Sequence, residues 1–500
     1  MRIADRAACT KPLVELTVRR RNRLGDVAGR SDARGALFAD QPRAMFARSS
    51  SLQDSRGLPR LARVTLRIVL ILSTRQVALA QLATDQVPRE RTIPVQESIK
   101  QEVESARYRL GPIHILPRLV LSNAGYDSNV FGTPSDCREA IGCQETKTAD
   151  WTATVAAGAR FVAPIGAKMF ATGDALPEYT WYQKLVSRRT TGGFYRASLY
   201  GFFNRVSLQV GGYTSKTSTP LSSETETRVI EVANDASANA ELELTRRLSA
   251  FGGAEIRRAR LGLAGVNLAV IGDVKQLDRD DEVARVGLRY RVSADWDVTL
   301  GTEGTRALFV LTPEKRNNQS VAYLAGIHYS RPRFFVSVNG GRREGRPLGG
   351  STFPDYTTST YSYFASYFLT RKLELQTFGH RGVYFGTPLA TEGGFANVFF
   401  VESRNGGGIN LEVHPRVLLQ ARAEYGNNKF PAPVLNAENT PVLRNDKVSN
   451  YSGGFSALLY RKVVLTALAT RQAYDSVVPG LTRKVDRFTT SLSFDGKLTR

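Results

Sequence analysis

Short connections rich in basic residues alternate strictly with long polar ones in this sequence, from residue 113 nearly to its end. The predicted tight turns are Gly166-Ala167-Lys168, Phe203-Asn204-Arg205, Arg246-Arg247, Ala294-Asp295, Arg331-Pro332-Arg333, Arg371-Lys372, His414-Pro415-Arg416 and Arg461-Lys462. The long connections span 125–149, 184–190, 215–226, 260–280, 310–318, 344–357, 386–395, 427–446 and 476–485. A β-barrel that inserts into a membrane from one side has this asymmetry, because the turns on one face stay short while the opposite loops can grow.

Apolar and polar residues alternate between these connections with the period of a β-strand. In one such segment Trp296, Val298 and Leu300 are separated by Asp297 and Thr299. We therefore predict an all-β fold over 113–500, a single transmembrane antiparallel up-and-down β-barrel of about eighteen strands, with about sixteen as the alternative. Its short turns and both termini would be periplasmic and its long loops extracellular. A β-propeller fits less well, because each blade needs four short strands where this repeat holds two long ones.

Composition excludes several other classes. Only 42% of the 500 residues are hydrophobic, and no run of apolar residues is long enough for a transmembrane helix. With 3 Cys, 3 Met and 4 His, the chain has little from which to build a metal or thiol site, so we expect no cofactor and no enzyme. The net charge of +22 is concentrated in residues 1–80 and in the tight turns, which argues against nucleic acid as a partner.

The N-terminal region is predicted to lie outside the barrel. Residues 1–80 are interpreted as a basic, unstructured extension that ends in an export signal, with a short apolar run from Val64 to Leu72 and a cleavage site at Ala78-Leu79-Ala80. Residues 81–112 would form a periplasmic linker or a short helix, and the linker is favoured. In an exported chain, Cys137 and Cys143 could form a disulfide.

Aromatic residues gather at both ends of the predicted strands, as in the interfacial girdles of membrane barrels. Those near the tight turns are Phe202, Phe203, Tyr290, Trp296, Tyr329, Phe334, Phe335, Phe368 and Tyr460. Those near the long loops are Tyr179, Trp181, Tyr213, Tyr384, Phe385, Phe399, Phe400, Tyr425 and Tyr474. The alternative interpretation is the ordinary preference of aromatic residues for strands.

A barrel of this size cannot fill its interior with side chains, so its inward residues should line a wet lumen. The predicted lumen-lining residues are Glu241, Glu243, Arg285, Arg289, Glu303, Glu374, His380, Arg422 and Glu424. This mixed charge predicts an aqueous pore for small hydrophilic solutes or for a polysaccharide. The expected partners are outer-membrane lipid, the outer-membrane assembly machinery, and such solutes.

The segment GPIHILPRLVLSNAGYDSNVFG, Gly111 to Gly132, resembles the start of the outer-membrane porins of the beta-barrel porin 2 group. The resemblance is also carried by Glu424-Tyr425-Gly426-Asn427-Asn428, Tyr474-Asp475-Ser476 and the closing RFTTSLSF, Arg487 to Phe494. It implies an outer-membrane location, and for some relatives a structural or docking role in the export of a surface polysaccharide. Many such barrels end in an aromatic residue, whereas this chain ends at Arg500, so Phe494 is expected to take that role.

The sequence offers residues for two other chemistries, a Ca²⁺ site and an embedded hydrolase. Asp127, Asn129, Asn427, Asn428 and Asp475 could supply oxygen ligands to Ca²⁺, but Asx residues at strand ends usually make local turns instead. An embedded hydrolase would need a base beside a nucleophile or an activated water, and His328 and His380 are the mid-strand histidines that face the predicted lumen. Glu374 lies too far along the strand from His380 to contact it.

Overall fold

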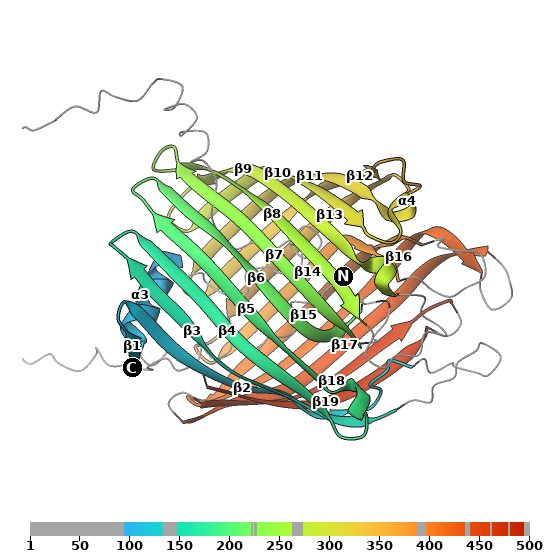
Figure 1. The fold of residues 1–500 in the computed structure, drawn as a ribbon, viewed down its shortest axis with the longest axis horizontal. Coiled ribbons are helices and arrows are strands. Elements are labelled where there is room, and N and C mark those ends of the chain that lie inside the picture. The colour runs from blue at the N-terminus through green and yellow to red at the C-terminus, as the bar shows by residue number, and fades with distance from the viewer. Residues whose placement is uncertain are drawn as a thin grey trace, which may run out of the picture.

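The chain folds into one antiparallel sheet of 19 strands in a computed structural model. The structure describes residues 95–133, 148–221, 224, 228–262, 274–387, 397–435, 441–460, 463–478 and 481–494. Each strand pairs with its neighbours in the sequence, and the last strand pairs with β2. The eighteen strands β2 to β19 therefore close into a barrel, and β1 is a three-residue addition that pairs with β2 (Figure 1). The predicted fold and the preferred strand count are confirmed.

Most strands are 12 to 16 residues long, which suits a tilted crossing of a bilayer. The strands are β1 Tyr108–Leu110, β2 Ile113–Asp127, β3 Asp150–Ile165, β4 Met169–Tyr182, β5 Thr190–Phe202, β6 Val206–Pro220, β7 Arg228–Glu243, β8 Leu248–Gly262, β9 Arg279–Arg291, β10 Trp296–Phe309, β11 Asn318–Arg331, β12 Phe334–Pro347, β13 Tyr356–Phe368, β14 Leu373–Phe385, β15 Phe399–His414, β16 Val417–Leu435, β17 Pro441–Tyr460, β18 Val463–Asp475 and β19 Arg483–Phe494. The helices are α3 Val95–Ser105, η4 Val186–Arg188, η5 Val274–Leu277 and α4 Pro313–Arg316.

Every predicted tight turn coincides with a short connection between strands. Arg461 and Lys462 themselves lie outside the described residues, but the strands on either side of them end at Tyr460 and begin at Val463. One predicted long connection is wrong in extent, because β16 and β17 continue as strands through most of 427–446. A register shift between Lys429 and Pro433 accommodates the prolines there, since a bulge does not need their missing N–H groups.

Some of the aromatic residues near the tight turns form a partial girdle on the outer wall, whereas Phe202 and Phe335 pack in clusters on the opposite face of the sheet. Trp296, Tyr329, Phe334 and Tyr367 contact one another in turn across β10 to β13 in tilted or edge-to-face arrangements, with ring centroids 4.6, 5.7 and 6.2 Å apart. At the long-loop end the prediction is only partly right. Tyr179 and Tyr425 are exposed there, but five others are buried in clusters of side chains: Tyr384, Phe385, Phe399, Phe400 and Tyr474.

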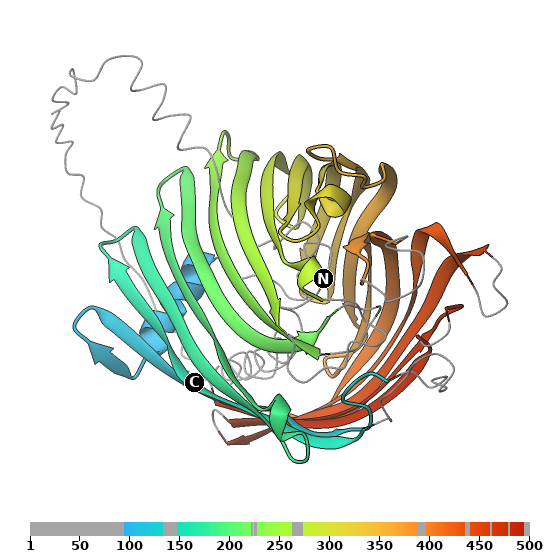
Figure 2. The same cartoon turned by 45° about the vertical axis from the view of Figure 1, so that its right-hand side comes forward.

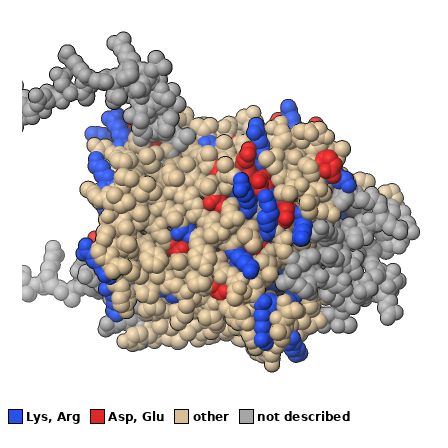
Figure 3. Space-filling model, in the orientation of Figure 1, with Lys and Arg blue, Asp and Glu red and all other residues tan. Residues whose placement is uncertain are grey.

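The outer face of the sheet is apolar over a broad band. Its exposed side chains include Val155, Leu199, Val286, Leu300 and Ile327. Figure 3 shows few charged side chains on this band, between Lys and Arg at the short-turn edge and a mixed group of charges toward the loops. A closed barrel with such a wall leaves no strand edge unpaired in lipid, which indicates the bacterial outer membrane.

No helix among the described residues is long and apolar enough to cross a membrane. Residues 95–105 belong to the stretch for which the sequence predicts a linker in preference to a short helix, but they form helix α3, which Figure 2 shows beside the barrel wall. Ile99 of α3 packs against Leu116, Val162, Phe170 and Tyr200 at the short-turn ends of β2 to β5. The predicted extension over residues 1–80 and the predicted disulfide between Cys137 and Cys143 lie outside the described residues.

Candidate functional site: the inner wall and the mouth of the barrel

The strand register separates the side chains into two faces. The face opposite to the exposed apolar residues carries most of the closely paired charges and contacts helix α3. All nine residues predicted to line the lumen fall on this polar face: Glu241, Glu243, Arg285, Arg289, Glu303, Glu374, His380, Arg422 and Glu424. Along the described strands, carboxylates outnumber guanidinium groups on this face.

Ion pairs attach helix α3 to the polar face. Arg160 of β3 donates to Glu102 of α3 at 2.6 Å and to Asp174 of β4 at 2.8 Å. Arg118 of β2 donates to the other oxygen of Asp174 at 2.9 Å. Two acids and two arginines therefore form one network in which each group has an opposite charge beside it, as partly buried charges require.

Similar ion pairs hold four of the predicted residues, Glu241, Arg285, Arg289 and Glu303, either between adjacent strands or between strands with one other strand between them. The pairs are Arg289 with Glu241 at 2.6 Å, Arg343 with Glu303 at 2.6 Å, Arg257 with Glu231 at 2.8 Å and Arg285 with Glu255 at 3.7 Å. Glu374 accepts a hydrogen bond from Asn410 at 3.0 Å. In contrast, Glu243 and Glu424 have no ion-pair partner among the described residues. Their carboxylates need water or a solute to satisfy them.

The two mid-strand histidines each have a polar partner on the polar face. His380 Nε2 lies 3.0 Å from Glu402, a partner on the next strand that the sequence pattern does not indicate. Glu402 also accepts from Arg404 at 3.0 Å. His328 Nδ1 lies 2.9 Å from Ser337 Oγ, but Ser337 is 0% exposed and so cannot reach a solute. A hydrolase centre needs a nucleophile or water that a solute can reach, whereas each histidine here contacts a buried group of the neighbouring strand, as in a structural pair.

The loop-side ends of β14 and β15 leave the barrel wall and fold inward. β13 begins at Tyr356, but its pairing with β14 extends only from Phe368 to Tyr361, opposite Arg381. β14 and β15 remain paired with each other as far as Phe385 and Phe399. We call residues 382–387 and 397–401 the inturned hairpin. Its departure from β13 frees both of its faces for contacts with other elements.

One face of the inturned hairpin packs in an apolar cluster at the mouth. Phe385 meets Phe309 of β10 edge to face at 4.9 Å, and Phe399 stacks on Phe353 of the β12–β13 loop at 5.3 Å. Other members come from the β6–β7 loop, β7, β8, η5, β10, β14 and the β14–β15 loop: Leu221, Val229, Leu261, Val274, Leu277, Ala307, Val383 and Val398. The opposite face packs through Tyr384 and Phe400 against Phe430 of β16. Segments from several walls of the barrel thus meet over its mouth.

A buried ion pair connects the β6–β7 loop with the far wall. Glu224 of this loop accepts from Arg444 of β17 at 2.6 Å and from the Thr387 N–H of the inturned hairpin at 2.7 Å. Its own backbone oxygen accepts from Arg483 of β19 at 2.7 Å. Arg444 also pairs with Asp446 at 2.6 Å. Arg444 and Glu224 are 0% and 1% exposed, so this contact is closed to water.

A second arginine holds the inturned hairpin from the β10–β11 loop. Arg316, at the end of α4, donates to the backbone oxygens of Gly386 at 3.1 Å and Val398 at 3.4 Å. Its guanidinium also lies over the ring of Phe309 at 5.8 Å. Burial among these groups lowers the pKa of Arg316 to about 10. The carbonyl oxygens compensate in part for the loss of water around the charge.

The oxygen-bearing residues considered for Ca²⁺ do not converge. Asp127 accepts from the Asn129 N–H and pairs with Arg487 at 2.8 Å, while Asn129 exchanges two hydrogen bonds with Thr133. Asn428 accepts from Arg404 on another part of the wall. No metal-binding group of three or more His, Cys, Asp or Glu residues occurs within the described ranges. The strand ends carry local turns, as the alternative interpretation held.

Comparison with known proteins gave structural likenesses only. No family model matches the chain, and no curated protein matches it. OccK2 (OpdF) of Pseudomonas aeruginosa, solved in complex with glucuronate, is similar with a TM-score of 0.45 and 11% identity over 76% of this chain and 98% of that one. OccAB3 of Acinetobacter baumannii has a TM-score of 0.44 and 10% identity over 76% of this chain and 99% of that one. OpdK of Pseudomonas aeruginosa, solved with vanillate, has a TM-score of 0.44 and 10% identity over 76% of this chain and 98% of that one.

Proposed function

We propose that this chain forms an aqueous pore in the outer membrane for small hydrophilic solutes. The observation that carries the proposal is a closed barrel whose outer wall is apolar and whose polar face holds rows of charges. Carboxylates such as Glu243 and Glu424 lie on that face without ion-pair partners among the described residues. Burying them in a dry interior would cost several kcal/mol each, on the order of magnitude for unpaired charges, so water must reach them.

The architecture of the mouth supports small solutes over a polymer. The inturned hairpin is held at the mouth by two residues from other loops. Arg316 donates to its backbone, and Glu224 accepts from its Thr387 N–H and from Arg444, and all of these contacts are buried. We expect such a construction to narrow the entrance, which favours small solutes over a polymer. The solved structures with glucuronate and vanillate are of similar barrels, and small organic acids are therefore sensible first solutes to test on this one.

Single-channel recording tests the proposal. The barrel is refolded, inserted into a planar lipid bilayer and bathed in KCl. We expect discrete conductance steps, and a bilayer that stays silent with a correctly folded barrel would refute a pore. Liposome swelling with sugars and organic acids of increasing size would then give the size limit at the mouth.

The second candidate, a docking component of a polysaccharide export system, follows from the sequence resemblance alone. It predicts that deletion abolishes a secreted polymer while the uptake of small solutes stays unchanged. The pore predicts the reverse. For either function, periplasmic termini and assembly by the outer-membrane machinery are part of the proposal, and protease accessibility of tags at each end would test the orientation.

A further inference from the structure

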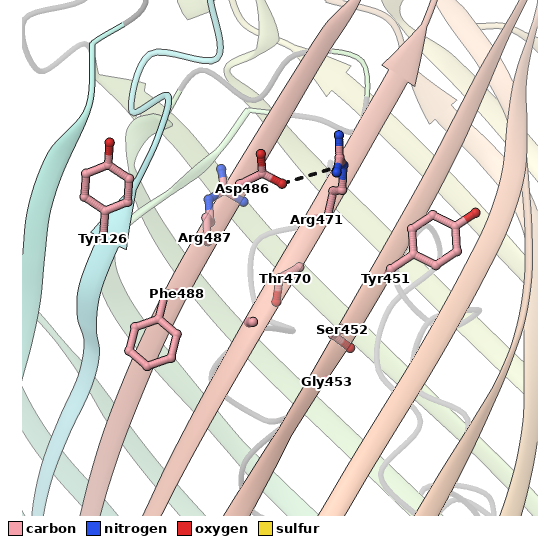
Figure 4. Close-up of a pocket in the computed structure, with 10 residues that line it drawn as sticks. Tyr126, Tyr451, Ser452, Gly453, Thr470, Arg471, Asp486, Arg487 and Phe488 are labelled. Atoms are coloured by element: carbon pink, nitrogen blue, oxygen red, sulfur yellow. Dashed lines mark ion pairs between the residues drawn. The ribbon is translucent and has the colours of Figure 1, made fainter.

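The outer wall has a groove over β17, β18 and β19, close to the seam with β2. Its volume is about 440 Å³, and Figure 4 shows it from outside the barrel. Two small residues, Gly453 and Ala469, form its floor, and three aromatic rings border it: Tyr126, Tyr451 and Phe488. The groove exists because the large aromatic side chains surround Gly453 and Ala469, which have no side chain and a single methyl group.

The groove opens toward the membrane and not toward the lumen. Tyr451 and Phe488 are 53% and 49% exposed and belong to the apolar outer face. The neighbouring Arg487 points the other way, where it pairs with Asp127 at 2.8 Å. Material that fills the groove must therefore come from the lipid phase or from another protein in the membrane.

Charged residues stand at the loop end of the groove. Arg471 and Asp486 face each other at 3.7 Å, a loose pair in which both side chains are more than half exposed. The next outward positions toward the loops hold Lys484 and, beyond it, Lys447 opposite Asp475. On the loop side of the apolar groove, three cations thus lie beside two carboxylates. Apolar residues followed by cations toward the loops match the acyl chains and the negatively charged headgroup of an anionic lipid.

We propose that the groove binds one anionic lipid, with an acyl chain along Gly453 and Ala469 and the phosphate group at Arg471 and Lys484. A guanidinium can hold a phosphate with two parallel hydrogen bonds, and basic residues beside a membrane select anionic headgroups. The site depends on the outer-membrane location of the barrel and not on what its lumen conducts.

A second copy of the barrel is the other possible occupant of this wall. It would have to cover Arg471 and Asp486 with its own apolar band, which leaves their charges poorly solvated. A lipid instead keeps both charges at the level of the headgroups. The balance of charge therefore favours the lipid.

Trp151 offers a reporter for the test. It is one of only three tryptophans in the chain, it is exposed on the outer wall, and its ring lies 5.8 Å from that of Tyr126. In a Trp181→Phe, Trp296→Phe background, phosphatidylglycerol or phosphatidylcholine with brominated acyl chains is titrated into detergent micelles that hold the folded barrel. We expect phosphatidylglycerol to quench Trp151 half-maximally at a several-fold lower mole fraction.

Three variants make the result specific. Arg471→Gln combined with Lys484→Gln should abolish the preference for phosphatidylglycerol. Gly453→Phe should fill the groove and weaken quenching, and it has room to fold, because an added Cβ would meet only the Gln420 oxygen at 3.9 Å. Gly304→Phe is the matched control on the outer face of β10, where an added Cβ meets nothing within 4 Å.

Equal quenching by both lipids, or quenching that Gly453→Phe leaves unchanged, would overturn the proposal. Sedimentation of the same samples identifies the other occupant. A dimer that Gly453→Phe dissociates would show that the groove is an interface between two copies, and it would also overturn the lipid site.

Discussion

Arg444 and Glu224 are 220 positions apart in the sequence, yet their side chains form a buried ion pair of 2.6 Å. Glu224 belongs to the β6–β7 loop and Arg444 to β17, so the pair connects two walls that are far apart around the barrel. The Thr387 N–H of the inturned hairpin donates to the same carboxylate. Glu224 is therefore the residue through which three segments of the mouth are held together.

Replacement Glu224→Gln should loosen the mouth. Arg444 would keep only Asp446 as its acidic partner, and removal of one member of a buried pair typically costs about 3 kcal/mol of unfolding free energy. We expect a larger and noisier single-channel conductance, measured in planar bilayers. Glu344→Gln, which changes a half-buried acid paired with Arg342 on the outer face of β12, is the control and should conduct like the parent. An unchanged conductance for Glu224→Gln would mean that this contact does not limit the pore.

Replacement Glu102→Gln should release helix α3 from the wall. Arg160 retains Asp174, so the loss is that of one charge-assisted hydrogen bond, on the order of 1.5–3 kcal/mol in local stability. Hydrogen exchange of residues 95–105, measured by mass spectrometry, should become faster. Glu97→Gln on the exposed side of the same helix provides the comparison. If both variants exchange at the parent rate, the apolar contacts of Ile99 alone hold the helix.

Replacement Arg422→Gln should shift the ion selectivity of the pore toward cations. Arg422 is on the polar face, where carboxylates already outnumber guanidinium groups, and Glu424 follows it on the same strand and face. The reversal potential across a KCl gradient reports this shift. Lys429→Gln, on the outer face of β16, should have the same reversal potential as the parent. A shift toward anions would contradict the assignment of this face to the lumen.

Replacement Val286→Arg should strongly destabilise the barrel. Val286 is 55% exposed near the middle of β9, and an arginine at the midplane of the lipid face of a barrel costs about 2–4 kcal/mol. Equilibrium unfolding by urea in vesicles measures the loss. Val477→Arg, in the β18–β19 loop outside the bilayer, should cost little. Equal stability of the two variants would place Val286 away from lipid.

The barrel itself could be predicted from the sequence because its determinants are local. A turn such as Arg331-Pro332-Arg333 and the alternation of Trp296, Val298 and Leu300 each carry their information within a few residues. The mouth could not be predicted in this way. Glu224 and Arg444 carry no pattern that marks them as partners, because a contact across 220 positions depends on how loops fold back over a finished barrel.

The aromatic residues illustrate the same limit. Phe385 and Phe399 have the sequence context of a girdle, at the loop ends of strands, yet the departure of β14 from β13 turns them into the apolar cluster at the mouth. The sequence places Glu374 on the same strand and face as His380, but the acidic partner of His380 is Glu402 of the neighbouring strand. Cross-strand register, which the sequence alone leaves open, decides which charges meet.

The seam between β2 and β19 has a consequence for biogenesis. Tyr126 pairs with Phe488, and Arg487 binds Asp127, a residue 360 positions earlier. The first strand of the barrel must therefore wait, with an open edge, until the last strand has been synthesised and exported. Contacts of such long range form slowly, and an unpaired edge invites wrong pairing. The interval before β19 reaches β2 is therefore the stage of assembly at which this barrel is most exposed to wrong pairing.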